Sequence, residues 1–310
     1  MDRREFLATG ASLAIAATGG CTGCARGPSA SLRMEPVDDV EIARRVTHRL
    51  ERDPDAPRYR LVAEAVENGS ATVQRTEPVG PERATYVYDG AVYELVRETV
   101  DERQATSFQI TLNPVDGSVP ERETVRFADL PPVDRGKFRE RGWVGDDVFL
   151  GFGTSLLYFP DEVADSALVP EPERSVIVWD RDTRGRFTVE GSAAVTQKTY
   201  RYEARLVDPS AADYGARVRR EHVFTLAGLS PAERDLVRTA IEEDRGYTVP
   251  ADESPPDALY RLRERFAGHE DLERTWEDES VDTGQYLVRY DGEVYWATVY
   301  APERTGTASG

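Results

Sequence analysis

Nucleophilic serine catalysis is the first chemistry for which the sequence can be searched. In a hydrolase the serine stands on a sharp turn between glycines, with a histidine and an acid in reach. The nearest run, Gly-Phe-Gly-Thr-Ser at 151–155, lacks the closing glycine. It also lacks the third glycine of a dinucleotide loop, and the chain has no Gly-Lys-Ser/Thr sequence to hold a phosphate. We therefore interpret it as a flexible segment beside a hydrophobic strand, and we assign no catalytic residue.

Metal binding would require histidine, cysteine or carboxylate side chains at ligand spacing. The histidines His48, His222 and His269 are far apart and form no H-x-x-x-H pair. Residues 180–185, Asp-Arg-Asp-Thr-Arg-Gly, open like a calcium loop, but an arginine takes a ligand position and Gly191 stands where the bidentate glutamate belongs. The segment is predicted to be a solvated hairpin turn, and we expect no metal ion and no other cofactor.

Aromatic side chains could stack on the apolar faces of a sugar. Two tryptophans, Trp179 and Trp296, lie in expected strands, which favours core packing. Trp143 and Trp276 lie in insertions flanked by charge and are the candidate ligand contacts, with core packing as the alternative. Paired carboxylates of the glycosidase type cannot be singled out, because the chain has 57 acidic residues.

The charge of the chain excludes one class of partner. The 310 residues include 57 Asp and Glu against 39 Lys and Arg, so the formal net charge is −18, and the only lysines are Lys137 and Lys198. Such a field repels phosphate backbones, so we expect no nucleic-acid partner. Hydrophobic residues make up 39% of the chain, which is enough for a folded core.

The first residues have the pattern of an export signal. The order Arg3-Arg4-x-Phe6-Leu7, followed by an apolar run at 8–20 too short to span a bilayer, resembles the twin-arginine signal of proteins exported after folding. Thr-Gly-Gly at 18–20 followed by Cys21 looks like a lipoprotein cleavage box, so we predict lipidation at Cys21. Cys24 is the poorer candidate, and an incidental cysteine pair is the alternative. The rest of the chain has no cysteine, hence no disulfide framework or thiolate nucleophile.

Signal and composition together resemble the uncharacterised twin-arginine lipoproteins of haloarchaea. At molar salt the Debye length is about 3 Å, so repulsion among carboxylates is screened and an acidic surface stays soluble. An ordinary acidic protein is the alternative. The resemblance implies a signal peptide at 1–24, a tether at 25–34 and a lipid anchor at the outer face of the cytoplasmic membrane, but it implies no activity.

The elements between tether and tail predict an α+β fold of degenerate modules, each a strand, a helix and an antiparallel hairpin. The sequence Tyr-Asp-Gly-x-Val-Tyr occurs at 88–93 and again at 290–295, and Asp-Gly between alternating runs predicts a hairpin. A longer turn at 178–189 is the weaker counterpart. The expected modules are 35–118, 119–210 and 211–302, followed by a disordered tail at 303–310. Coincidence of common α+β patterns is the alternative to duplication.

A helix precedes each hairpin. The clearest begins at Ser230-Pro231 with Glu233 as the third member of a capping box, and residues 128–135 match 227–234 in spacing. The first helix ends before Asn-Gly at 68–69, with Asp55 as its expected cap. A further short helix is expected within 255–266, and alternating strands at 108–113 and 200–206.

Three functions compete at this point. The leading hypothesis is a non-catalytic surface lipoprotein with an interaction or envelope role, whose partner is a cell-surface protein or a glycan. The second is a solute- or glycan-binding lipoprotein with a pocket lined by Trp143 and Trp276. The third is a carboxylate-dependent hydrolase, which predicts two facing acids with displaced pKa values.

Overall fold

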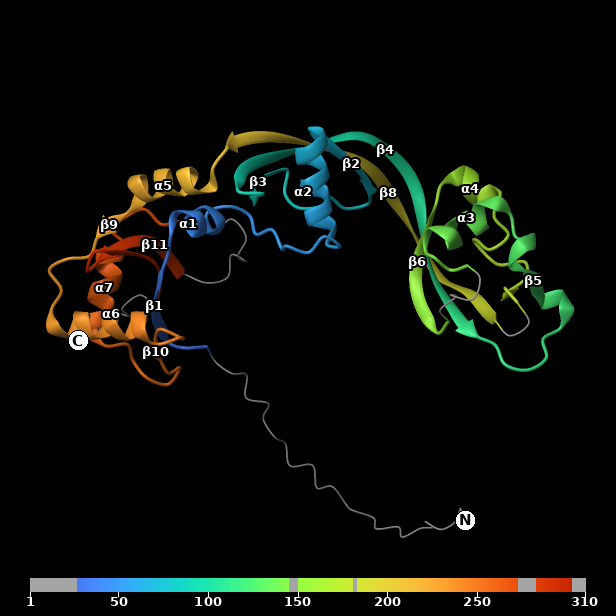
Figure 1. The fold of residues 1–310 in the computed structure, drawn as a ribbon. Coiled ribbons are helices and arrows are strands. Elements are labelled where there is room, and N and C mark those ends of the chain that lie inside the picture. The colour runs from blue at the N-terminus through green and yellow to red at the C-terminus, as the bar shows by residue number, and fades with distance from the viewer. Residues whose placement is uncertain (1–26, 145–149, 181–182, 273–282, 303–310) are drawn as a thin grey trace, which may run out of the picture. The chain divides into compact units, whose positions relative to one another are not determined.

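In a computed structural model, the structure describes residues 27–144, 150–180, 183–272 and 283–302 (Figure 1). They divide into two compact units. Residues 27–37, 220–272 and 283–302 form the terminal unit, and the described residues within 38–219 form the ribbon unit. The export-signal residues Arg3, Arg4, Phe6 and Leu7, the lipidation candidate Cys21 and the candidate ligand contact Trp276 lie outside the described residues.

The terminal unit is built on a five-stranded sheet. Its strands lie in the order β10 (Tyr247–Val249), β1 (Ala30–Pro36), β12 (Glu293–Tyr300), β11 (Thr283–Tyr290) and β9 (Phe224–Thr225). The β11–β12 hairpin turns at Asp291-Gly292, both with positive φ (48° and 87°), which is what an Asp-Gly turn requires. The hairpin predicted at 290–295 is confirmed.

Two helices cover one face of this sheet, α6 (Pro231–Glu242) and α7 (Asp257–Phe266). The predicted capping box is present at the start of α6, where Ser230 and Glu233 bond each other's backbone N–H. The short helix expected within 255–266 is α7, whose Leu262 and Phe266 are fully buried in the core. A helix of this length gains its stability from that apolar face.

The ribbon unit holds the longest strands. Its helices are α1 (Asp39–Arg45), α2 (Pro57–Asn68), α3 (Pro132–Glu140), α4 (Pro160–Ala164) and α5 (Ala211–His222), whose last three residues belong to the terminal unit. Its strands are β2 (Ser70–Arg75), β3 (Arg83–Tyr88), β4 (Ala91–Pro114), β5 (Thr124–Arg126), β6 (Phe152–Tyr158), β7 (Val176–Val178) and β8 (Arg184–Asp208), with short 3₁₀ turns η1 (Glu121–Glu123) and η2 (Phe127–Asp129).

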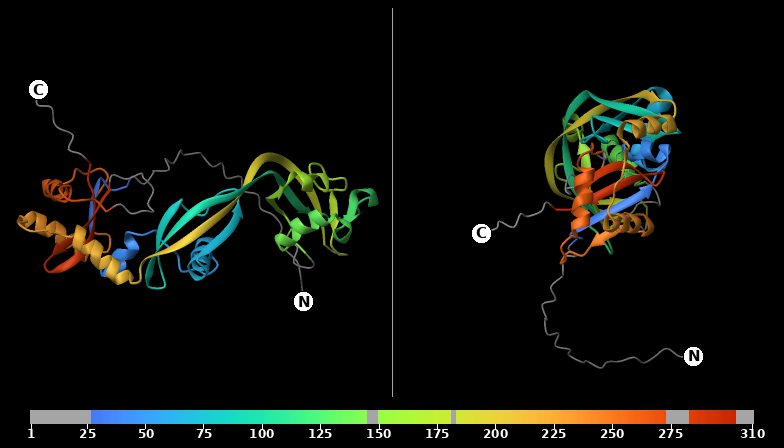
Figure 2. Two further views of the ribbon diagram at one scale, coloured as in Figure 1. Left: turned by 90° about the horizontal axis from the view of Figure 1, so that it is seen from above. Right: turned by 90° about the vertical axis from the view of Figure 1, so that its left-hand side faces the viewer.

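β4 and β8 pair antiparallel from Val92–Asp208 to Pro114–Gly185, and Figure 2 shows them running side by side. The ladder is interrupted by extra residues at Val207 and Glu190 on β8 and at Val100 on β4. At one end the strand order is β3-β4-β8-β2, and at the other it is β6-β4-β8-β7-β5. We call the β4–β8 pair the ribbon.

The ribbon carries two separate hydrophobic cores. Near β2 and β3, α2 packs Leu61 and Val62 against a face that includes Tyr200 and Tyr202. Near β6 and β7, α3 packs Phe138 against another set, Phe108, Ile110, Leu112, Leu156, Tyr158 and Phe187. A smaller cluster of Ala43, Val92 and Ala211 joins α1 and the start of α5 to the β3–β4 hairpin.

The α+β fold is confirmed. The hairpins at 88–93 and 178–189 are present as β3–β4 and β7–β8. The division into two units differs from the three expected modules, because β4 and β8 fall into different modules yet pair along their length. The expected cap Asp55 is wrong: α2 begins after Ala56 without a side-chain cap.

Candidate functional site

Asp134 is a carboxylate whose side chain is completely buried. Buried carboxylates often belong to functional sites, so Asp134 is a candidate for chemistry by residue type. It accepts hydrogen bonds from the Tyr158 hydroxyl at 3.0 Å, the Ser166 hydroxyl at 2.6 Å and the Ala167 N–H at 2.9 Å. Burial, with the Asp134 charge as the next cause, raises the pKa of Tyr158 far above its usual value. Asp134 therefore joins α3 to β6 and to the segment after α4.

A second contact fastens the same helices. Lys137 on α3 donates to both carboxylate oxygens of Glu162 on α4, at 2.8 and 2.7 Å. Glu162 also accepts the Phe159 N–H at the start of α4, at 2.9 Å. Both side chains are mostly buried, so this ion pair is screened less than the exposed ones on the surface.

Glu233 occupies the position of α6 that Asp134 occupies in α3, the third helical residue after the cap. Its carboxylate accepts the Ser230 N–H at 2.7 Å and the Arg265 Nε–H at 3.2 Å. Burial alone would raise the pKa of Glu233, but the hydrogen bonds from Ser230 and Arg265 outweigh it and leave this pKa below its usual 4.5. Glu233 thus stays ionised and ties α6 to α7.

Asp208 closes the end of β8 in a similar manner. It accepts the Ser210 N–H at 3.0 Å and an Arg217 Nη1–H at 2.9 Å. The backbone bond from Ser210, followed by the Arg217 contact, holds the pKa of Asp208 below its usual value against the effect of burial. Catalysis by a general acid requires the opposite shift, a raised carboxyl pKa.

The three histidines are placed separately. In the ribbon unit, the His48 Nδ1 accepts the Thr85 N–H at 3.3 Å, which requires that nitrogen to be unprotonated. In the terminal unit, His269 stacks on Phe224 with ring centroids 3.7 Å apart, and His222 lies 3.2 Å from Glu270. Across the described ranges, no group of three or more histidine, cysteine or acidic side chains is placed to hold a metal ion.

The described residues of the runs 151–155 and 180–185, which resemble catalytic and calcium-binding motifs, lie at the start of β6 and at the turn into β8. Ser155 lies within β6 opposite Gln109, and its carbonyl accepts from Arg141 at 2.9 Å. In the calcium-like run, Asp180 accepts the Thr183 N–H at 2.7 Å, as a turn residue does, while residues 181 and 182 lie outside the described part.

Trp143 packs in an aromatic cluster around the buried Phe138. Its ring lies 5.6 Å from that of Phe138 and 4.7 Å from that of Phe152, and it is partly buried against this core. The Trp179 ring also lies 5.9 Å from that of Phe138, and it stacks on Phe127 at 6.0 Å. The packing places the Trp143 ring among core side chains.

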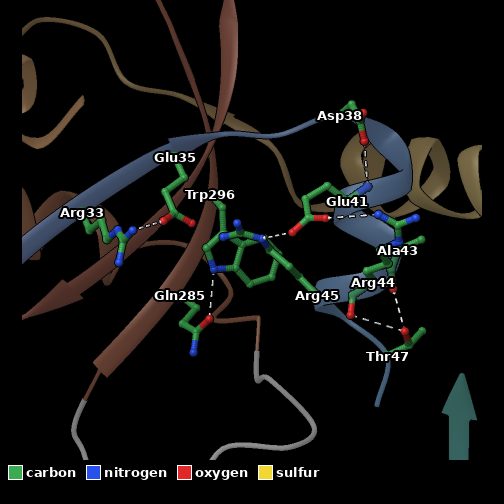
Figure 3. Close-up of polar contacts among 10 residues, drawn as sticks. All are labelled: Arg33, Glu35, Asp38, Glu41, Ala43, Arg44, Arg45, Thr47, Gln285 and Trp296. Carbon is green, nitrogen blue, oxygen red and sulfur yellow. Dashed lines mark hydrogen bonds and ion pairs between the residues drawn. The ribbon is translucent and has the colours of Figure 1, made fainter. Parts of the chain in front are cut away.

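Figure 3 shows polar contacts that lie within each unit separately. In the terminal unit, the buried Trp296 donates its indole N–H to the Gln285 side chain at 3.0 Å. In the ribbon unit, Asp38 caps α1, and Arg45 donates to Glu41 at 2.9 Å. These side chains maintain local structure.

A shallow depression of about 600 Å³ lies at the end of α6 in the terminal unit. It is lined by residues 239 and 242–248, among them the exposed acids Glu242, Glu243 and Asp244.

No helix in the described ranges is both long and apolar enough to cross a membrane.

The two outer edges of the ribbon differ in charge. On β4, the stretch 98–105 between β3 and β6 carries four charged residues among eight, Glu98, Asp101, Glu102 and Arg103, and the bulge at Val100. On β8, the stretch 188–197 between β7 and β2 carries one charged residue among ten, Glu190. On the side away from β4, no described strand pairs with this stretch, and we call that side the open edge of β8.

Sequence reasoning missed both Asp134 and the open edge. The match of 128–135 with 227–234 already aligned Asp134 with Glu233, which could have marked it. The run Gly-Ser-Ala-Ala-Val-Thr-Gln at 191–197 has no charge in a chain that is 31% charged, which could have marked the edge. Comparison of the chain with protein-family models, characterised proteins and solved structures finds no match.

Proposed function

We propose that this chain is an exported, lipid-anchored surface protein of a halophilic archaeon, and that it acts by binding rather than by catalysis, in an interaction or envelope role. The twin-arginine residues Arg3 and Arg4 and the cleavage box before Cys21 support the export and the anchor. The anchor would hold the protein at the outer face of the cytoplasmic membrane.

The observation that carries the binding role is the ribbon. At about 3.3 Å per residue, its strand of 24 residues would extend about 80 Å. The sheet narrows to two strands where 103–105 pair with 195–197, between the α2 core and the α3 core. A two-stranded pair is marginally stable alone, so separating two cores in this way costs stability. An arrangement of two cores joined by a two-stranded ribbon is what a scaffold that presents binding surfaces would have.

The carboxyl groups support the same conclusion. The described carboxyl groups with shifted pKa values, Asp208 and Glu233, are shifted downward by hydrogen bonds that fasten helices. Asp134 accepts three hydrogen bonds from within the fold. These acids therefore serve the fold, whereas a hydrolase would need one carboxyl with a raised pKa facing another.

Cell fractionation of a haloarchaeal host tests the proposal. Lysine at both Arg3 and Arg4 should leave unprocessed precursor inside the cell, and Cys21→Ser should release the protein to the medium. Cys24→Ser is the matched control and should stay anchored. Membrane retention of the first two variants would refute the export and the anchor. A hydrolytic activity at molar salt, abolished by one point substitution, would refute the binding role.

A further inference from the structure

We propose that the open edge of β8 binds an extended, uncharged peptide segment of a partner protein, which adds to the sheet as a further strand. The inference rests on the proposed binding role but not on export. Its starting point is the backbone of β8 between β7 and β2.

The hydrogen-bonding direction of this edge follows from its neighbours. Ala204 donates its N–H to Gly69 on the β2 side of β8. β8 has no bulge between Ala204 and Ser192, and backbone groups of alternate residues point to the same side. Ser192, Ala194 and Thr196 therefore direct an N–H and a C=O each away from β4. Together they offer six groups to an incoming strand.

The edge has defined ends. Phe187 already donates to Ser175 beside β7, and Lys198 is already paired with Arg75 of β2. The ten residues between them span about 33 Å at about 3.3 Å per residue. An added strand of about five to eight residues fits between these ends and must leave the sheet beyond them.

The side chains on the edge define the chemistry of the partner. Ser192, Ala193 and Ala194 are small and exposed, and the run 191–197 contains no charge that could pair with an ion. The β-branched residues Val195 and Thr196 are of the type that favours strand pairing. An acidic segment would be repelled by the net charge of −18. Because the run 191–197 has no charged side chain to pair with one of either sign, we commit to an uncharged partner segment.

A second copy of β8 does not fit this edge. If a second copy paired antiparallel with this edge so that the two Ala194 residues lay opposite each other, residue 190 of the copy would lie opposite Lys198. Arg75 of β2 already pairs with Lys198. Because β8 runs without a break for 25 residues, the copy could not end there. A short segment that leaves the sheet avoids this collision.

Edges of this kind are normally protected, which makes the exposure informative. Natural sheets cover free edges or furnish them with charges, prolines and bulges, because an open edge recruits other strands. On the ribbon, β4 has this protection at 98–105, and β8 retains only the bulge at Glu190. Strand addition is the recognition mode that such an edge supports.

Backbone amide exchange of the full chain tests the proposal. The probe is a capped peptide of six alternating threonines and valines on a flexible glycine-serine tail. We expect it to slow exchange at Ser192, Ala194 and Thr196 by about tenfold. Ala193 and Val195, which face β4, should not change. The control peptide has the same sequence with every backbone amide N-methylated, so that neither of its edges can donate, and it should give no protection.

A pair of variants at one position isolates the hydrogen bond. Ala194→Pro removes an outward N–H without removing a bond to β4, so it should fold and lose the protection by the peptide. Ala194→Ser keeps the N–H and should retain it. If Ala194→Pro does not fold, the N-methylated peptide makes the same test on the unchanged chain.

Three outcomes would overturn the proposal. The first is an absence of protection at millimolar peptide, and the second is equal protection by the methylated peptide. The third is protection that grows with protein concentration in the absence of peptide, which would assign the edge to a second copy. Because purified protein is used, failure here leaves the export test standing, and failure of export leaves this inference standing.

Discussion

Replacing Asp134 by alanine is expected to destabilise the ribbon unit by about 4 kcal/mol. The carboxylate accepts three hydrogen bonds, and its removal leaves the Tyr158 and Ser166 hydroxyls and the Ala167 N–H without this acceptor in a buried place. Each buried donor left unpaired costs about 1–3 kcal/mol. Ser166 also accepts from the N–H groups of residues 168 and 169, so its oxygen stays bonded while its O–H loses its acceptor.

Two further substitutions calibrate this value. Tyr158→Phe removes one hydrogen bond and should cost about 1 kcal/mol, while Asp134→Asn keeps the shape and should cost about 2 kcal/mol. Denaturant unfolding gives the free energies, and amide exchange at Ala167 reports the loss locally. If the free energy of unfolding of Asp134→Ala lies within about 0.5 kcal/mol of that of the parent chain, the three hydrogen bonds to this carboxylate do not stabilise the fold as inferred.

Three other predictions concern glycine packing and pH. A Cβ at Gly215 would stand 1.7 Å from the Asp39 carbonyl oxygen, so Gly215→Ala should destabilise the protein by about 1–3 kcal/mol. Gly136 lies in the interior of α3 with open space around it, so Gly136→Ala should stabilise the protein by about 0.5–1 kcal/mol. Denaturant unfolding measures both changes. Burial lowers the pKa of His48 below 6.5, so protonation favours the unfolded chain. The free energy of unfolding should therefore fall as the pH drops below about 6.5 and level off below the folded-state pKa. His48→Gln should remove this pH dependence from the unfolding midpoints. The contribution of Glu233 should be fully present above about pH 4.5 and be lost as pH falls through its lowered folded-state pKa, and acid titration of Glu233→Gln should lack this transition.

Local signals in the sequence predicted the short-range structure. The Asp-Gly turns at 89–90 and 291–292 require positive φ at both residues, and the structure has it. The Ser-Pro-x-Glu start of α6 is equally local, since all its hydrogen bonds lie within one turn. Asp55 failed as a cap because the Asp53 side chain accepts its N–H and the helix starts after Ala56.

Long-range pairing could not be predicted in the same way. The strands that form the ribbon start at Ala91 and end at Asp208, and their partners are up to 116 residues apart (208 − 92). The bulges at Val100 and Glu190 shift the alternation of side chains, which divides each long strand into shorter patterns. The role of Asp134 was hidden for the same reason, because its partners lie 24–33 residues further along the chain.

The charge of the chain gains meaning from the ribbon. If the acidity were only an adaptation to salt, it should cover both exposed edges of one pair of strands. Instead β4 carries four charges in eight residues and β8 one in ten. At molar salt, where exposed charges are screened beyond about 3 Å, backbone hydrogen bonding and apolar packing still operate. An uncharged edge is therefore the part of this surface on which recognition would change least with salt, and the run 191–197 carries no charge.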